Sequence, residues 1–138
     1  MKKYLVIGNP IEHSLSPKLQ NYWIKNNNIS AIYEKRKIDE DEIESLISEV
    51  KKKKLSGINV TIPFKKKVIP YLDRLSFEAK STQSVNTIYL DNDKVIGHNT
   101  DIGGFELSIK NLKFKIAGKK SFYIGCRWSG TINNFCFK

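Results

Sequence analysis

Short apolar runs alternate along the chain with longer stretches in which apolar residues recur every three or four positions. The short runs are rich in Val, Ile and Tyr and are bounded by Gly, Pro, Asn or Asp, which is typical of strands. The predicted strands cover residues 3–8, 29–38, 57–60, 85–90, 94–98 and 120–124. Asp91-Asn92-Asp93 separates two of these strands and predicts a hairpin.

The longer stretches predict helices, and start signals mark two of them. Ser16 precedes Pro17 and is the expected N-cap of the first helix, with proline at its first position. The stretch 39–54 opens with four acidic residues and closes with four lysines, an order that complements the helix dipole. The predicted helices cover residues 16–26, 39–54, 64–72, 75–82 and 101–111.

The alternation of strands and helices predicts an α/β fold. Connections through helices favour a mostly parallel sheet with helices on both faces. Ligands of such sheets bind outside the carboxyl ends of the strands. Polar side chains at those positions are therefore candidates for a binding site.

Polar side chains gather at the expected strand ends. The candidate site residues are Ser14, Ser16, Asn59, Thr61, Lys65, Asn86 and Asp101. Hydroxyl, amide, carboxylate and ammonium groups together suit a small molecule that carries hydroxyls and a carboxylate. Each residue alone also has a structural interpretation, since Ser16 can be a helix cap and Lys65 a solvated lysine beside Lys66 and Lys67.

Length and composition predict a globular, cytoplasmic protein. The chain has 138 residues, of which 40% are hydrophobic and 28% charged. No apolar run approaches the ~20 residues that cross a bilayer, and the basic start is too short for a signal peptide. We expect no membrane partner. The sequence leaves the oligomeric state open.

The net charge of +10 raises the possibility of nucleic-acid binding. The basic residues are nearly all lysines, however, whereas bidentate phosphate contacts favour arginine. We therefore expect a small-molecule substrate and no nucleic acid. Cys126 and Cys136 have no zinc-ligand spacing, and His13 and His98 lie far from them, so we expect no metal.

Four segments resemble, in order and spacing, the substrate domain of the shikimate dehydrogenase family. They read GNPIEHSLSPKLQN, GINVTIPFK, SVNTIY and GHNTDIGG, and the resemblance covers about residues 4–110. The related quinate/shikimate dehydrogenases share these motifs. The resemblance implies NADP-dependent reduction of 3-dehydroshikimate to shikimate, a step of aromatic amino-acid biosynthesis.

The resemblance also implies a role for each candidate residue. Ser14 and Ser16 would hold the substrate carboxylate. The ring hydroxyls would be held by Asn59, Thr61, Asn86 and Asp101. Lys65 would be the catalytic proton carrier with Asp101 as its partner, and an ammonium is the protonated form at neutral pH.

The last part of the chain departs from the family pattern. We expect a shikimate-binding domain at residues 1–110, followed at 111–138 by a linker and the truncated start of a Rossmann domain for NADP. Gly125 would begin the phosphate-binding loop, but Arg127 and Trp128 stand where glycines are required. The chain alone is therefore expected not to oxidise NADPH. A shikimate-binding module without redox activity and a basic nucleic-acid-binding domain remain alternatives.

We predict that the chain is read in a shifted frame after Gly125. With suitable synonymous codons and one base removed, the tail from Gly125 becomes Gly-Ala-Gly-Gly-Val-Val-Pro-Ser, a glycine-rich turn suited to a pyrophosphate. Sequencing the genomic DNA tests this. A divergent natural terminus is the alternative. An early stop in the shifted frame, or the lack of a further strand–helix pattern in it, would contradict the frameshift.

Overall fold

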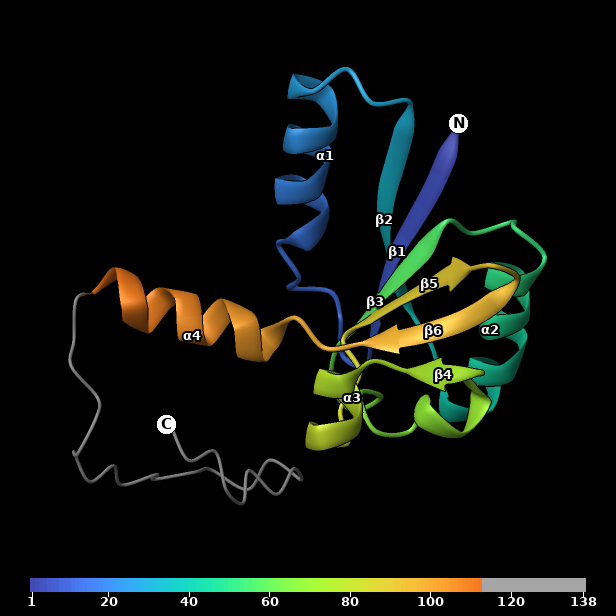
Figure 1. Cartoon of the computed structure of the whole chain (residues 1–138). Helices are drawn as coiled ribbons and strands as arrows, with labels where there is room; N and C mark the ends of the chain where they lie inside the picture. Colours follow the sequence, from blue (N-terminus) through green and yellow to red (C-terminus); the bar gives the residue numbers. More distant parts are fainter. Residues whose placement is uncertain (113–138) are drawn as a thin grey trace.

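The structure is a computed structural model that describes residues 1–112, in which six strands form one sheet (Figure 1). The order across the sheet is β2-β1-β3-β5-β6-β4. The strands are β1 (Lys2–Gly8), β2 (Ala31–Lys37), β3 (Gly57–Val60), β4 (Arg74–Leu75), β5 (Thr87–Asp91) and β6 (Lys94–His98).

Five of these described strands run in one direction. β1 pairs in parallel with β2 and β3, and β4 pairs in parallel with β6. β5 is antiparallel to both of its neighbours, β3 and β6. The predicted mostly parallel sheet and the predicted hairpin at 91–93 are confirmed.

Helices lie on both faces of the sheet, as the sequence predicts. The described helices are α1 (Ser16–Asn26), α2 (Ile43–Lys51), α3 (Phe77–Thr82) and α4 (Asp101–Asn111), with short 3-10 turns at η1 (Glu40–Glu42) and η2 (Ile69–Tyr71). In Figure 1, α1 and α2 stand on opposite sides of the strands, whereas α4 extends away from the sheet. None of the residues of α4 is buried.

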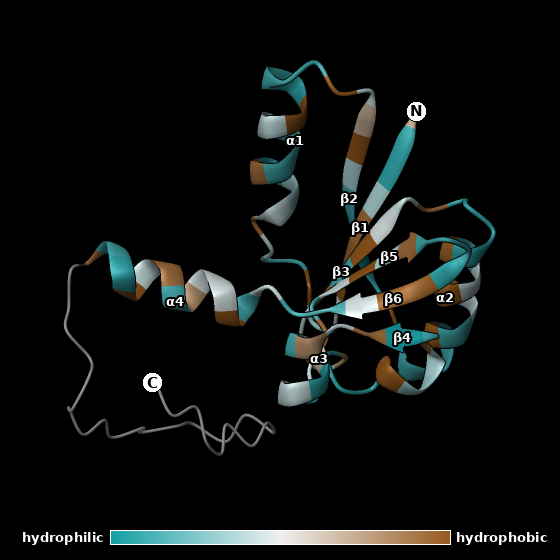
Figure 2. Ribbon diagram, viewed as in Figure 1, coloured by the Kyte–Doolittle hydropathy of each residue, from teal (hydrophilic) through white to brown (hydrophobic). Residues whose placement is uncertain are grey.

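The alternation of side chains along β1 divides the core between the two faces. Leu5 and Ile7 join the larger cluster with the apolar residues of α2, whereas Val6 packs with Tyr33 and with Ile24 of α1. Figure 2 shows the hydrophobic segments of β5 and β6 beside α2. The apolar stripe predicted for α2 is buried throughout, at Ile43, Leu46, Ile47 and Val50.

Two predicted helices differ from the structure. Residues 62–68 form turns instead of a helix, and only η2 is helical within 64–72. Pro70 has no N–H to donate, and Pro63 lies just before the segment, so a regular helix does not continue there. The helix predicted at 75–82 begins at Phe77, since residues 74–75 form β4, a strand too short to show an alternating pattern.

The α2 segment begins later than its acidic residues suggested. Residues 40–42 form η1, and Asp39 and Glu42 make a capping box in which the Asp39 N–H donates to the Glu42 carboxylate at 2.8 Å. Within residues 1–112 no helix combines the length and the apolar character needed to cross a membrane.

Gly8 lets the end of β1 approach the segment that follows β3. A Cβ atom at Gly8 would lie 2.7 Å from Thr61 Cγ2 and 3.0 Å from the Ile62 carbonyl oxygen. The Thr61 N–H donates to the Ile7 carbonyl at 2.9 Å and joins the same two segments. A side chain at position 8 would therefore displace Thr61.

We predict that Gly8→Ala lowers the free energy of unfolding by about 1–3 kcal/mol, the usual cost of overpacking. Chemical denaturation of the 138-residue chain measures this loss. Gly104→Ala is the matched control, because a Cβ there has nothing within 4 Å and alanine favours a helix. An unchanged midpoint for Gly8→Ala would show that the Thr61 segment yields freely.

Candidate active site

The direction of β5 brings the candidate residues to one edge of the sheet. β1, β3 and β6 all end at this edge, and the antiparallel β5 begins there. Asn86 directly precedes β5, and Asp101 follows β6 at the start of α4. Hydrogen bonds join Asn59, Asn86, Asp101 and Lys65 to one another, whereas the side chains of Ser14, Ser16 and Thr61 make no hydrogen bond to them.

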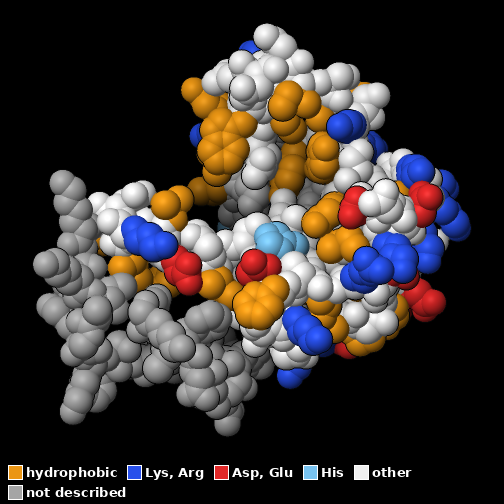
Figure 3. All heavy atoms as spheres, viewed as in Figure 1, with side chains coloured by type: hydrophobic (Ala, Val, Ile, Leu, Met, Phe, Trp, Pro, Cys, Tyr) orange, Lys and Arg blue, Asp and Glu red, His pale blue; other side chains and the backbone are white. Residues whose placement is uncertain are grey.

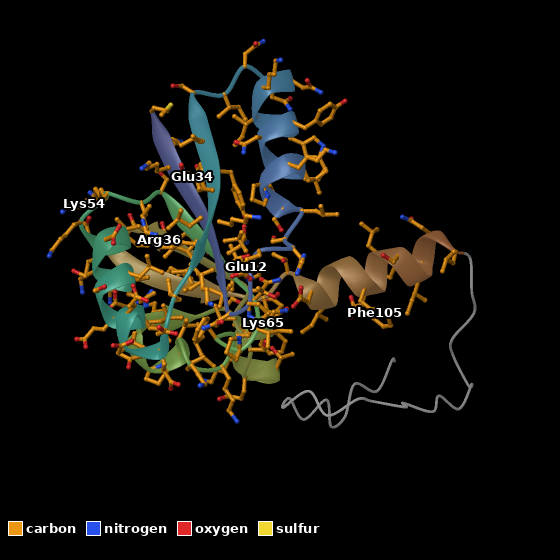
Figure 4. All side chains as sticks on the ribbon, turned by 180° about the vertical axis from the view of Figure 1, so that it is seen from behind. Glu12, Glu34, Arg36, Lys54, Lys65 and Phe105 are labelled. Atoms are coloured by element: carbon orange, nitrogen blue, oxygen red, sulfur yellow. The ribbon has the colours of Figure 1, made fainter. Side chains whose placement is uncertain are left out.

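Lys65 and Asp101 form an ion pair at the centre of this edge. Lys65 Nζ donates to Asp101 Oδ2 at 2.7 Å, and the two side chains are 30% and 54% exposed. Figure 4 shows Lys65 close to the start of α4. The pair is thus held by the structure yet remains open to a ligand.

Backbone contacts fix both ends of this ion pair. The Lys65 carbonyl accepts from the Val85 N–H at 2.8 Å. The Asp101 N–H donates to Asn99 Oδ1 at 2.9 Å, and Asn99 is buried. Asp101 is also the first residue of α4, where the helix dipole favours a carboxylate.

Asn86 uses every hydrogen-bonding position of its side chain. Its Nδ2 donates to Thr100 Oγ1 and to Asp101 Oδ1, both at 2.8 Å. Its Oδ1 accepts from the Thr100 N–H and from Thr87 Oγ1, both at 3.0 Å. An amide has two donors and two acceptor positions, so no position is left over.

Asn59 is nearly saturated as well, through a tyrosine that the sequence did not single out. Tyr33 of β2 donates its hydroxyl to Asn59 Oδ1 at 2.7 Å. Asn59 Nδ2 donates to the Asn86 carbonyl at 3.2 Å and to Thr87 Oγ1 at 3.1 Å. Burial raises the pKa of Tyr33 to about 12, because the phenolate would lose its hydration.

Tyr33 and Thr87 are the functional candidates that sequence reasoning missed. Thr87 adjoins Asn86 in the segment SVNTIY, so its position beside a candidate was a usable signal. Tyr33 gave no such signal, because it lies 26 positions from Asn59 on another strand.

The serines after β1 differ from the expected capping arrangement. α1 begins at Ser16, and its N-cap is Leu15, which makes no side-chain cap. The prediction of Ser16 as N-cap is therefore wrong by one position. Instead, Ser14 Oγ accepts from the Ser16 N–H at 3.3 Å. Both serines are half-buried.

The remaining binding capacity lies in hydroxyls and charges. Within residues 1–112 the hydroxyl of Ser16 and that of Thr61 make no hydrogen bond, and Lys65 Nζ makes one, to Asp101. Ser14 uses its oxygen as an acceptor and keeps its O–H to donate. These groups can bind an anion and hydroxyls and can deliver a proton from an ammonium.

A hollow lies between α1 and the face of the sheet, and of the seven candidate residues only Asn59 lines it. It has a volume of about 340 Å³ and includes Tyr33, Asn59 and Thr87 in its wall. Figure 3 shows hydrophobic side chains on α1 and along the strands that border it. Among residues 1–112 no three His, Cys, Asp or Glu side chains lie close enough to hold a metal ion. Gly125, predicted for the cofactor, lies outside the described residues.

The comparison with known families gives a match over most of the described chain. A profile of the shikimate dehydrogenase substrate binding domain matches residues 6–88. Shikimate dehydrogenase (NADP(+)) of Pelagibacter ubique is 56% identical over 124 residues, which are 90% of this chain and 47% of the relative. The chain thus spans about half the length of the curated relatives it matches.

Solved structures match with the same partial coverage. Shikimate 5-dehydrogenase of Listeria monocytogenes in complex with shikimate and NAD has a TM-score of 0.80 at 30% identity, over 86% of this chain and 41% of that one. The Thermus thermophilus enzyme in complex with NADP(H) and shikimate has a TM-score of 0.76 at 29% identity, over 83% and 44%.

We predict that Tyr33 makes the free energy of unfolding decrease as the pH becomes alkaline. Its pKa is about 12 in the folded chain against 10 for an ordinary tyrosine. Its contribution is complete below pH 10 and is lost as the pH rises toward 12, because the unfolded chain releases the proton first. Between pH 9 and pH 11 the free energy of unfolding should fall by about 1 kcal/mol more in the wild type than in Tyr33→Phe.

Urea denaturation at the two pH values measures this difference. Tyr22→Phe is the control, because Tyr22 is 61% exposed on α1 and should leave the pH dependence unchanged. Equal pH dependence in the wild type and Tyr33→Phe would contradict the prediction.

Proposed function

The chain belongs to the family of the shikimate dehydrogenase substrate binding domain, and we propose its function on that basis. It binds shikimate and 3-dehydroshikimate and supplies the proton-transferring half of an NADP-dependent dehydrogenase. The observation that carries the proposal is the Lys65–Asp101 ion pair of 2.7 Å, at the edge of the sheet where β1, β3 and β6 end.

The substrate carboxylate is proposed to bind at the start of α1. The hydroxyls of Ser14 and Ser16 are available as donors there, and the helix N-terminus favours an anion. Thr61 offers a third hydroxyl at the end of β3. These groups bind substrate and product alike and fix the ring relative to Lys65.

Asn86 and Asn59 have little hydrogen-bonding capacity left for a ligand. The side chain of Asn86 is fully bonded, so it reaches a ring hydroxyl only by exchanging one bond. We assign the exchange to the bond with Thr100, because the bond with Asp101 ends on a carboxylate and is the stronger. Asn59 can only accept one further hydrogen bond, at Oδ1.

Lys65 is proposed to transfer the proton. NADPH, when bound, supplies the hydride to the carbonyl carbon. The carbonyl π electrons move to oxygen, and the oxygen takes a proton from the Lys65 ammonium, leaving a neutral amine. Asp101 keeps the ammonium aimed at the oxygen through its bond to Nζ. In the reverse direction the neutral amine accepts the proton.

The ion pairs of the basic residues support a small ligand over nucleic acid. Arg36 pairs with Glu49 at 3.4 Å, and Lys53 pairs with Asp93 at 3.1 Å. Both cations therefore have an acidic partner on the protein surface, which reduces the charge they offer to a phosphate backbone.

We predict that the 138-residue chain binds shikimate and that Ser14→Ala weakens binding about 10- to 100-fold. The lost hydrogen bond goes to a charged group and contributes about 1.5–3 kcal/mol. Isothermal titration calorimetry measures both affinities, and Ser81→Ala, an exposed serine on α3, is the control. If the wild type does not bind shikimate, the proposed function is contradicted. If Ser14→Ala binds as tightly as Ser81→Ala, only the role of Ser14 is contradicted.

We predict that Lys65→Ala lowers turnover by about 10²–10⁴-fold with little change in shikimate affinity, the usual effect of losing a general acid. Turnover is measured after fusing residues 1–110 to the remaining part of the Pelagibacter ubique relative. Lys66→Ala, an exposed neighbour, is the matched control. Near-normal turnover of Lys65→Ala would make Lys65 a structural lysine. An active fusion would show that residues 1–110 carry the groups needed for proton transfer.

A further inference from the structure

Four consecutive hydrogen bonds run in one direction from β2 to the ion pair. Each group donates to the next one, and the series ends on the carboxylate that Lys65 contacts from the other side. In order of donation, the residues are Tyr33, Asn59, Thr87, Asn86 and Asp101. We call this series the donor chain.

Two backbone groups fix the direction of the donor chain. The Asn86 carbonyl can only accept, so the Asn59 amide must turn its Nδ2 toward it, at 3.2 Å. Asn59 Oδ1 then faces Tyr33, whose hydroxyl must donate to it. A flipped Asn59 would place oxygen against oxygen.

The second fixed point is the Thr100 N–H, which can only donate. Asn86 must therefore present Oδ1 to Thr100, at 3.0 Å, and Nδ2 to Asp101. The single O–H of Thr87 then donates to Asn86 Oδ1. The Thr87 oxygen is therefore the acceptor in its bond with Asn59 Nδ2. The hydroxyl of Thr87 is the sole side-chain link between the two amides in this series.

We propose that Tyr33 and Thr87 are positioning residues, which hold the Asn59 and Asn86 amides so that Asn86 keeps Asp101 aimed at Lys65. This inference rests on the proposed function, in which Lys65 transfers the proton. Hydrogen bonds in such a series polarise one another. The Tyr33 hydroxyl, as the first donor, therefore strengthens the bond from Asn86 to Asp101. Tyr33 is buried, and its hydroxyl donates to Asn59 Oδ1 at 2.7 Å.

Loss of Thr87 would divide the donor chain into two parts. Asn59 Nδ2 would keep only the Asn86 carbonyl, and Asn86 Oδ1 would keep only Thr100. The Asn86 amide would then turn more freely, and its bond to Asp101 would weaken. In the divided chain, no series of side-chain hydrogen bonds connects the Tyr33 hydroxyl to the Asn86 amide, and Asn59 reaches only the Asn86 backbone carbonyl.

The first experiment measures this path in the unliganded 138-residue chain. The side-chain amide resonances of Asn59 and Asn86 are followed by ¹⁵N–¹H spectroscopy in the wild type, Tyr33→Phe, Thr87→Val and the double variant. We expect Tyr33→Phe to move the Asn86 resonances in the wild-type background and to leave them unmoved in the Thr87→Val background. Thr87→Ser keeps the hydroxyl and should retain the wild-type response.

Two results would overturn the inference. One is that Tyr33→Phe leaves the Asn86 side-chain amide resonances unmoved. This result can be obtained even if Thr87→Val does not fold. The other is an equal response with and without the Thr87 hydroxyl, which would mean that the change reaches Asn86 through packing. The backbone resonances of each variant report whether it is folded.

The second experiment adds shikimate to the same samples. We expect Thr87→Val to bind shikimate about 3- to 10-fold more weakly and Thr87→Ser to restore binding, as for the loss of one hydrogen bond. Equal weakening by Thr87→Val and Thr87→Ser would overturn the positioning role. If the wild type binds no shikimate, the proposed function fails, whereas the coupling of Tyr33 to Asn86 is still decided by the unliganded spectra.

Discussion

Asn86 connects the segments that form the candidate active site. Its backbone N–H donates to the His98 carbonyl of β6, and its carbonyl accepts from the Val60 N–H of β3. Its side chain reaches Thr100 and Asp101 at the start of α4. An amide that is buried with every position bonded has only one acceptable orientation, so the relative placement of these segments is tightly fixed.

This completeness extends to the surroundings of Asn86. Within residues 1–112 no buried side-chain nitrogen or oxygen lacks a hydrogen-bond partner. Burying an unpaired polar group costs several kcal/mol, so a network of this kind is stable only when all its members are present. The rigid part of the site therefore lies below the surface, whereas the Lys65–Asp101 pair and the hydroxyls of Ser16 and Thr61 remain at the edge where a ligand arrives.

The division between rigid and available groups fits a substrate domain. Hydroxyls and an ammonium at the edge can bind an anion and donate a proton, and the donor chain ends on the Asp101 carboxylate that Lys65 contacts. The chain spans about half the length of its curated relatives, and the matched profile describes a substrate binding domain. The proposed function assigns hydride supply to the bound cofactor and proton transfer to the described residues.

The local elements and the chemical types of the site residues follow from the sequence. The apolar period of α2, the hairpin at 91–93 and the polar residues at strand ends depend on neighbours along the chain, and the structure contains all three. Only the tertiary structure decided that Tyr33 of β2 bonds to Asn59 and that Asn86 is fully bonded, because these contacts join strands far apart in sequence. The position of Leu15 as the N-cap of α1 and the two-residue β4 were likewise set by backbone conformation and strand pairing that no periodic pattern of side chains records.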